Sequence, residues 1–142
     1  MIEFKWYKNV ISDDARLIRE VVFQDEQGVL PEEEFDGSDK FCDSVVMYLD
    51  NMPIATGRII IGNRGEAVLG RIACIASQRG KGHGKALVKE LINKCINKGF
   101  DAIFIHSQTH ARGFYKSLGF EEYGEVYMEA GIAHINMKLI IK

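Results

Sequence analysis

The stretch that decides the fold runs over residues 72–86 and reads Ile72-Ala73-Cys74-Ile75-Ala76-Ser77-Gln78-Arg79-Gly80-Lys81-Gly82-His83-Gly84-Lys85-Ala86. A strand pattern ends here and a helical pattern begins. Because three alternate glycines lie between the two patterns, successive backbone N–H groups can point into one concavity at the helix N-terminus. Three cations, Arg79, Lys81 and Lys85, reinforce the attraction for an anion. The stretch therefore predicts a phosphate-binding turn.

The spacing of the turn excludes two common phosphate motifs. A P-loop on Gly84-Lys85 would need a glycine at Arg79 and a hydroxyl group at Ala86. The dinucleotide fingerprint would need a glycine at Lys85 or at Leu87. The pattern that remains is Arg79-x-x-Gly82-x-Gly84.

A second motif follows about thirty residues later, and it reads Ala111-Arg112-Gly113-Phe114-Tyr115-Lys116-Ser117-Leu118-Gly119-Phe120. Together the two motifs resemble the GNAT superfamily of acetyl-CoA-dependent N-acetyltransferases. In that family the glycine turn holds the pyrophosphate of coenzyme A. Three further segments are similar to the small bacterial ElaA/YjcF-type branch, namely Val22-Phe23 with Glu26-Gln27, residues 32–36 and residues 129–135.

The periodicity along the chain predicts a coarse order of elements. Alternation at residues 2–7 predicts a strand, and an amphipathic helix is expected from Asp13 to Phe23. Residues 20–39 hold eight acids and no Lys or Arg, which predicts a long acidic loop. Strands at 45–49, 54–61 and 66–75 form an antiparallel meander. The helix that ends before Gly99 and an apolar strand at 100–105, expected to be buried on both faces, predict a parallel crossover.

The rest of the chain predicts a second helix, with an apolar stripe at 111, 114, 115 and 118, and two strands near 123–128 and 134–141. The expected fold class is α/β (α+β) in a single domain over residues 1–142. The resemblance implies the GNAT fold, in which a central mixed, mostly antiparallel sheet is flanked by helices and a splayed parallel strand pair holds acetyl-CoA.

Composition excludes several classes of protein. The chain has 142 residues, of which 46% are hydrophobic, and a formal charge of −2, so no general basic field attracts nucleic acid. No apolar run approaches the roughly 18 residues of a membrane span. Three distant cysteines argue against a disulfide framework or a cysteine-built zinc site. His106 and His110 stand four residues apart but lack a partner motif for a metal. We expect a cytoplasmic protein with no metal, membrane or nucleic-acid partner.

The resemblance also implies which residues hold the cosubstrate acetyl-CoA. The strand Ile72-Ala73-Cys74 would pair with the pantetheine arm, and a backbone N–H near Cys74 would polarise the thioester carbonyl. Gln108 stands where the family often has Asn. Tyr115 would touch the cosubstrate and protonate the departing thiolate as the catalytic acid. The expected pyrophosphate contacts are Arg79, Gly80, Lys81, Gly82, His83, Gly84 and Lys85.

The general base stays open among Glu26, Glu129 and His134. A lysine-like amine is only about 0.04% neutral at pH 7, so direct attack on the thioester needs a group that accepts its proton. The implied function is acetyl transfer from acetyl-CoA to a primary amine. That amine belongs to an unknown small-molecule or peptidic acceptor. The alternative is a non-catalytic acyl-CoA-binding or sensor domain.

The oligomeric state also stays open between monomer and homodimer. The C-terminal strand, Met137-Lys138-Leu139-Ile140-Ile141, alternates in a way that would serve either pairing across a dimer or an internal position in the sheet.

Overall fold

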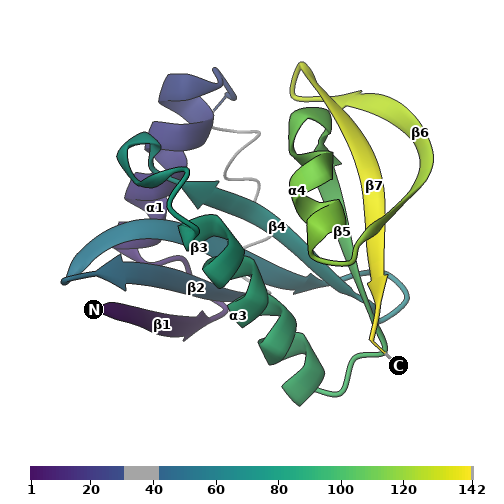
Figure 1. Ribbon diagram of the computed structural model, residues 1–142, viewed down its shortest axis with the longest axis horizontal. Helices are drawn as coiled ribbons and strands as arrows, with labels where there is room; N and C mark the ends of the chain where they lie inside the picture. Colours follow the sequence, from purple (N-terminus) through teal and green to yellow (C-terminus); the bar gives the residue numbers. More distant parts are fainter. Residues whose placement is uncertain (31–41, 142) are drawn as a thin grey trace.

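A seven-stranded sheet in the order β1-β2-β3-β4-β5-β7-β6 forms the centre of the protein in a computed structural model, which describes residues 1–30 and 42–141 (Figure 1). The strands are β1 (Ile2–Lys8), β2 (Cys42–Leu49), β3 (Met52–Ile61), β4 (Ala67–Cys74), β5 (Ala102–Gln108), β6 (Glu121–Glu129) and β7 (Ile132–Ile140). The helices are α1 (Asp13–Arg19), the π-helix η1 (Glu20–Glu26), α3 (His83–Asn97) and α4 (Arg112–Ser117), with short 3₁₀ turns η3 (Ala76–Gln78) and η4 (Thr109–Ala111).

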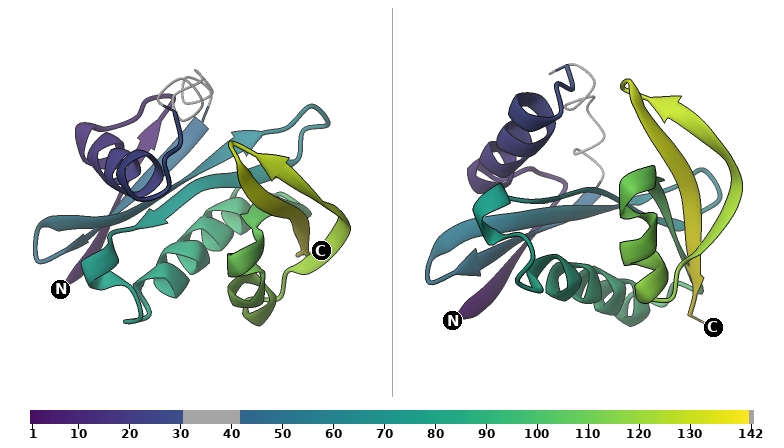
Figure 2. Two further views of the ribbon diagram at one scale, coloured as in Figure 1. Left: turned by 90° about the horizontal axis from the view of Figure 1, so that it is seen from above. Right: turned by 45° about the horizontal axis from the view of Figure 1, so that its top comes forward.

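The helices cover both faces of the sheet. Figure 2 shows α1 and η1 on one face and α3 and α4 on the other. The larger core lies on the α3 and α4 face, where α3 buries Leu87, Val88, Leu91 and Cys95. The apolar spacing of this helix also predicts Ile92 and Ile96 on the buried face, but Ile92 is half-buried and Ile96 is exposed. On the opposite face, Ala15, Ile18 and Val22 of the first helix pack against Val46 and Tyr48 of β2.

The predicted meander and crossover are confirmed. Strands β2, β3 and β4 pair antiparallel in sequence order, and β4 pairs with β5 in parallel through the crossover helix α3. Among the pairings of the described strands, β4 with β5 is the parallel one, so the sheet is mixed and mostly antiparallel, as expected.

The expected extent of the acidic loop is wrong at its start. Residues 20–26 are helical and continue α1 without a break, because Val22 and Phe23 bury their side chains against the sheet while Asp25 stays exposed. The apolar spacing of the first helix predicts Leu17 on its buried face, but Leu17 is exposed. The acids at positions 32, 33, 34, 36 and 39 lie outside the described residues.

Strand β5 also differs from its prediction. It starts two residues later than expected and ends at Gln108, because Ser107 and Gln108 pair with Ile135 and His134 of β7. The strand is not buried on both faces. Ile103 and Ile105 enter the larger core, whereas His106 on the opposite face is exposed. The prediction ended this strand too early because the side chains at its end are polar.

The C-terminal strand is an internal strand. β7 pairs with β5 on one side and β6 on the other, so its backbone is not an edge that could pair across a dimer. The edge strands of the sheet are β1 and β6. No helix within the described ranges is long and apolar enough to cross a membrane.

Candidate functional site

The parallel strands β4 and β5 stay paired over only three residue pairs, from Ala67 with Ile103 to Leu69 with Ile105. A bulge in β4 follows at once, since Arg58 of β3 faces Gly70 and Thr56 faces Ala73. Two residues of β4 therefore lie opposite Gly57, and one of them, Arg71, has a left-handed φ of 50°. Such a bulge bends its strand, which here separates β4 from β5.

A cavity of about 890 Å³ opens where the two strands separate. Residues of η1, β5 and β7 line this cavity, and Figure 1 shows the ribbon of η1 apart from those of β5 and β7 at the same end of the molecule. Of the residues predicted for the site, the cavity is lined by Glu26, Ile72, Ala73, Cys74, Arg79, Gln108, Tyr115, Glu129 and His134. Residues from seven separate elements and turns thus meet at one place. The volume suits an extended ligand together with a small second molecule.

The glycine turn lies next to this cavity and does not line it. Gly80 and Gly82 both have left-handed φ values, 75° and 83°, and an added Cβ at either would meet nothing within 4 Å. Gly82 is the N-cap of α3, so His83, Gly84 and Lys85 occupy the first turn, where backbone N–H groups lack partners within the helix. Lys81 and Lys85 are exposed beside them. This turn has the backbone conformation and the charge of a phosphate cradle.

The side chain of Arg79 does not point into open solvent. Its two terminal nitrogens donate to the two carboxylate oxygens of Glu26 at 2.9 and 2.8 Å, and its Nε donates to the backbone carbonyl of Cys74 at 2.9 Å. Residues predicted for two different roles, phosphate binding and proton transfer, are therefore bound to each other.

Gln108 makes a second contact across the cavity. Its side-chain amide and that of Gln27 donate to each other's oxygen, at 2.9 and 3.2 Å, and His110 Nε2 lies 2.6 Å from Gln108 Oε1. Sequence reasoning did not place Gln27 in the site. Its partner is 81 residues away, and no local pattern marks such a pair.

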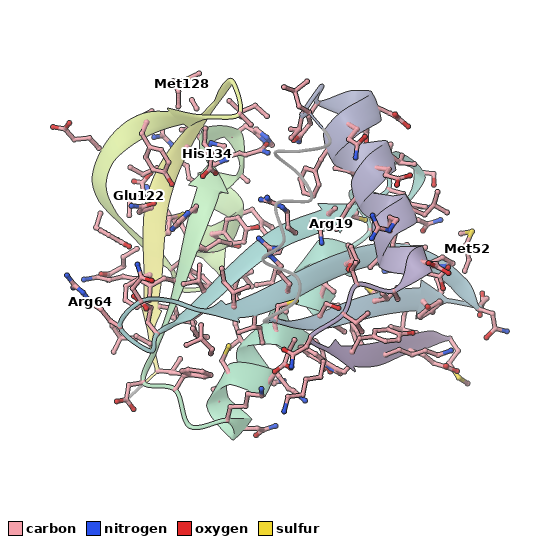
Figure 3. All side chains as sticks on the ribbon, turned by 180° about the vertical axis from the view of Figure 1, so that it is seen from behind. Arg19, Met52, Arg64, Glu122, Met128 and His134 are labelled. Carbon is pink, nitrogen blue, oxygen red and sulfur yellow. The ribbon has the colours of Figure 1, made fainter. Side chains whose placement is uncertain are left out.

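His134 is the one buried histidine among the described residues, and it lies beside the end of β5 in register with Gln108 (Figure 3). Its Nδ1 lies 2.7 Å from the backbone carbonyl of Ile132. Because a carbonyl oxygen can only accept, Nδ1 carries the hydrogen, and in the neutral ring Nε2 keeps its lone pair. Nε2 lies 3.6 Å from a carboxylate oxygen of Glu129, and the ring stacks on Tyr127 at 5.9 Å.

Tyr115 comes from α4, on the face of the sheet opposite α1 and η1, and is 7% exposed. Its ring packs edge-on against Phe114 and Phe120, with centroids 5.1 and 5.8 Å away. Burial raises the pKa of the phenol far above its usual value, because the phenolate would lose its hydration. The hydroxyl is therefore a proton donor that stays protonated throughout the neutral and moderately alkaline range.

Cys74 ends β4 and is half-buried, and burial raises the pKa of its thiol more than nearby Arg79 lowers it. It is thus a thiol rather than a thiolate near neutral pH. Within residues 1–30 and 42–141, no group of three or more His, Cys, Asp or Glu side chains is placed to hold a metal ion. His106 and His110 are separated by the end of β5, His106 lying on the strand and His110 in η4.

Comparison with known proteins gives consistent findings. Residues 29–141 match the family described as "Acetyltransferase (GNAT) domain". The chain is 34% identical over 125 residues to the protein named N-acetyltransferase YjcF of Bacillus subtilis, covering 87% of this chain and 89% of that protein.

Solved structures agree with the sequence relatives. The crystal structure of Escherichia coli ElaA superposes with a TM-score of 0.87 at 27% identity, covering 98% of this chain and 99% of that one. A GNAT family acetyltransferase from Elizabethkingia anophelis, crystallised with acetyl-CoA bound, superposes with a TM-score of 0.75 at 18% identity, covering 99% and 98%.

Proposed function

This chain belongs to the GNAT acetyltransferase family and is an acyltransferase, and from that premise we propose that it transfers an acetyl group from acetyl-CoA directly to a primary amine. The acceptor is a small molecule or a peptide, and residues 1–142 act as one domain. The observation that carries the proposal is the separation of β4 and β5, which brings a protonated phenol, Tyr115, and an oriented imidazole, His134, to one cavity.

The residues present fit acetyl-CoA. The open glycine turn and the first turn of α3 offer unpaired N–H groups and two lysines to the pyrophosphate. The backbone of Ile72, Ala73 and Cys74 borders the cavity after pairing with β5 has ended, so it can receive the pantetheine arm as an added strand. Bound in this way, acetyl-CoA supplies the thioester whose carbonyl carbon the amine attacks.

Among the three candidate bases, His134 is favoured by its geometry. Its Nε2 has the lone pair that an amine proton needs, and the hydrogen bond from Nδ1 to the Ile132 carbonyl holds the ring in place. The Glu129 carboxylate at 3.6 Å stabilises the imidazolium that forms. Glu26 is less suited, because both of its carboxylate oxygens already accept from Arg79.

Tyr115 completes the proton balance. As the amine nitrogen forms its bond to the carbonyl carbon, the carbon–sulfur bond breaks, and the phenol gives its proton to the departing thiolate of coenzyme A. His134 takes the proton from nitrogen, so each group handles one proton. Tyr115 comes from α4 and His134 from β7, and both side chains line the same cavity, which supports their assignment as a separate acid and base.

The test is acetyl transfer measured by mass spectrometry, with acetyl-CoA and a mixed panel of polyamines, amino sugars, amino acids and peptides with free lysines or N-termini. His134→Gln is run beside wild type. We expect an acetylated amine with wild type and a loss of about 10²-fold or more with the variant, with unchanged acetyl-CoA affinity by calorimetry. Binding of acetyl-CoA with no product from any amine would favour the sensor domain instead.

A further inference from the structure

Two adjacent residues at the end of η1 reach the two strands that separate around the cavity. Glu26 binds Arg79, whose Nε holds the carbonyl of Cys74 at the end of β4. Gln27 binds Gln108, the last residue of β5. One turn of helix thus joins the ends of both strands, five and three residues beyond Leu69 and Ile105, where their own pairing stops. We call Glu26, Gln27, Arg79 and Gln108 the rim clamp.

We infer that the rim clamp sets the separation of β4 and β5 at the point where acetyl-CoA lies between them, so that Glu26 and Gln27 are positioning residues for the acyl donor. The inference rests on the proposed function and extends it. It also gives Glu26 and Arg79 roles other than proton transfer and phosphate binding, because the two side chains act through each other and through the Cys74 carbonyl.

The geometry of the Glu26–Arg79 contact supports a positioning role. Both guanidinium nitrogens and both carboxylate oxygens take part, which fixes orientation as well as distance. The Arg79 side chain is 47% exposed and that of Glu26 is 32% exposed, so the pair is partly shielded from water. Arg79 is also pulled back toward β4 by its own Nε contact, and in this position its fork faces η1 instead of the glycine turn.

The Gln27–Gln108 contact supports the same role on the other strand. Each amide both donates and accepts, so the pair satisfies two donors and two acceptors at the cavity wall. His110 adds a third partner to Gln108. Gln108 is in register with His134 on β7, so a shift of Gln108 would move the strand that adjoins the proposed base.

Two double-mutant cycles test the clamp, with acetyl-CoA affinity measured by calorimetry and transfer kinetics measured on the amine found in the panel. The first cycle uses Glu26→Gln, Arg79→Gln and the double variant, and the second uses Gln27→Met, Gln108→Met and their double. We expect each single variant to weaken acetyl-CoA binding by about fivefold, and each double variant to be no weaker than its singles. The KM for acetyl-CoA should rise while the KM for the amine stays within about twofold.

Matched controls are available in the same chain. Glu122 binds Lys116 and Arg112 away from the cavity, and Gln24 lies on η1 outside the cavity lining. Glu122→Gln and Gln24→Met should leave acetyl-CoA affinity unchanged. Arg79→Lys keeps the charge but loses the fork, so it should behave like Arg79→Gln.

Different outcomes overturn different statements. An additive first cycle, with Glu26→Gln silent and Arg79→Lys like wild type, would assign Arg79 to phosphate binding and overturn the clamp. If wild type binds acetyl-CoA but acetylates no amine, the proposed function fails, and the binding cycles still decide the clamp. If wild type does not bind acetyl-CoA at all, both are wrong.

Discussion

Replacing Tyr115 with phenylalanine isolates the proposed acid. The variant removes one oxygen atom and keeps the ring, whose contacts with Phe114 and Phe120 are apolar. The free energy of unfolding should therefore change by no more than about 1 kcal/mol. At this chain length such a change moves the melting temperature by only about 2–4 °C. Any large loss of activity then reports on chemistry and not on folding.

The expected loss follows from the role of the hydroxyl. A positioned general acid contributes about 10²–10⁴-fold, which corresponds to about 2.7–5.4 kcal/mol of transition-state stabilisation. Because burial raises the pKa of Tyr115 well above 10, the wild-type phenol stays protonated up to that pH. The ratio of wild-type to variant kcat should thus be constant between pH 6 and pH 10.

The assay is release of the coenzyme A thiol over time, with acetyl-CoA saturating and the accepted amine varied. Tyr123→Phe is the matched control, since Tyr123 lies on β6 outside the cavity lining and should keep full activity. Full activity of Tyr115→Phe would refute the acid role. An alkaline fall in rate below pH 10 that disappears in the variant would refute the protonation state argued from burial.

Three further outcomes test the fold and the cradle. Leu91→Ala should lower the free energy of unfolding by about 2–5 kcal/mol in urea titrations, because Leu91 is fully buried between α3 and β3; a loss below 1 kcal/mol would contradict the packing. Gly82→Ala should cost about 1–2 kcal/mol from its left-handed φ and weaken acetyl-CoA binding, and equal affinity would remove the turn from the site. Burial raises the pKa of Cys95 to about 11 and that of Tyr127 to about 12, so the unfolded chain loses these protons first. Stability should therefore fall as pH rises from 8 to 11, and a rise would contradict this sign.

Local signals predicted the parts of the fold that local chemistry determines. The glycines at 80 and 82 occupy left-handed conformations at the strand-to-helix turn, and Leu87, Val88 and Leu91 are buried at helical spacing. The parallel crossover followed from the strand, helix and strand order alone. In each case the residue type carries its conformational preference or its hydrophobic period within a few positions.

The errors fall where tertiary contacts override the local pattern. Acidic residues suggested a loop that overlaps the end of the helix predicted to Phe23, yet the chain stays helical three residues further, through Glu26, where Val22 and Phe23 bury apolar surface. The end of β5 looked like a loop because Ser107 and Gln108 are polar. Their strand conformation comes from pairing with β7, whose residues lie almost thirty positions further along the chain.

The site itself shows why residue types suggest chemistry more readily than roles. Taken alone, Glu26 predicts a base, because a carboxylate accepts protons. Taken alone, Arg79 predicts a phosphate ligand, because a guanidinium binds anions. The two residues are 53 positions apart in the sequence, and their bidentate contact changes the role that is expected of each. For His134, the hydrogen bond to a backbone carbonyl two residues away fixes the tautomer, so Nε2 keeps the lone pair that the proposed base needs. The partners that these side chains already have therefore favour His134 over Glu26 as the proposed base, and the fold sets those partners.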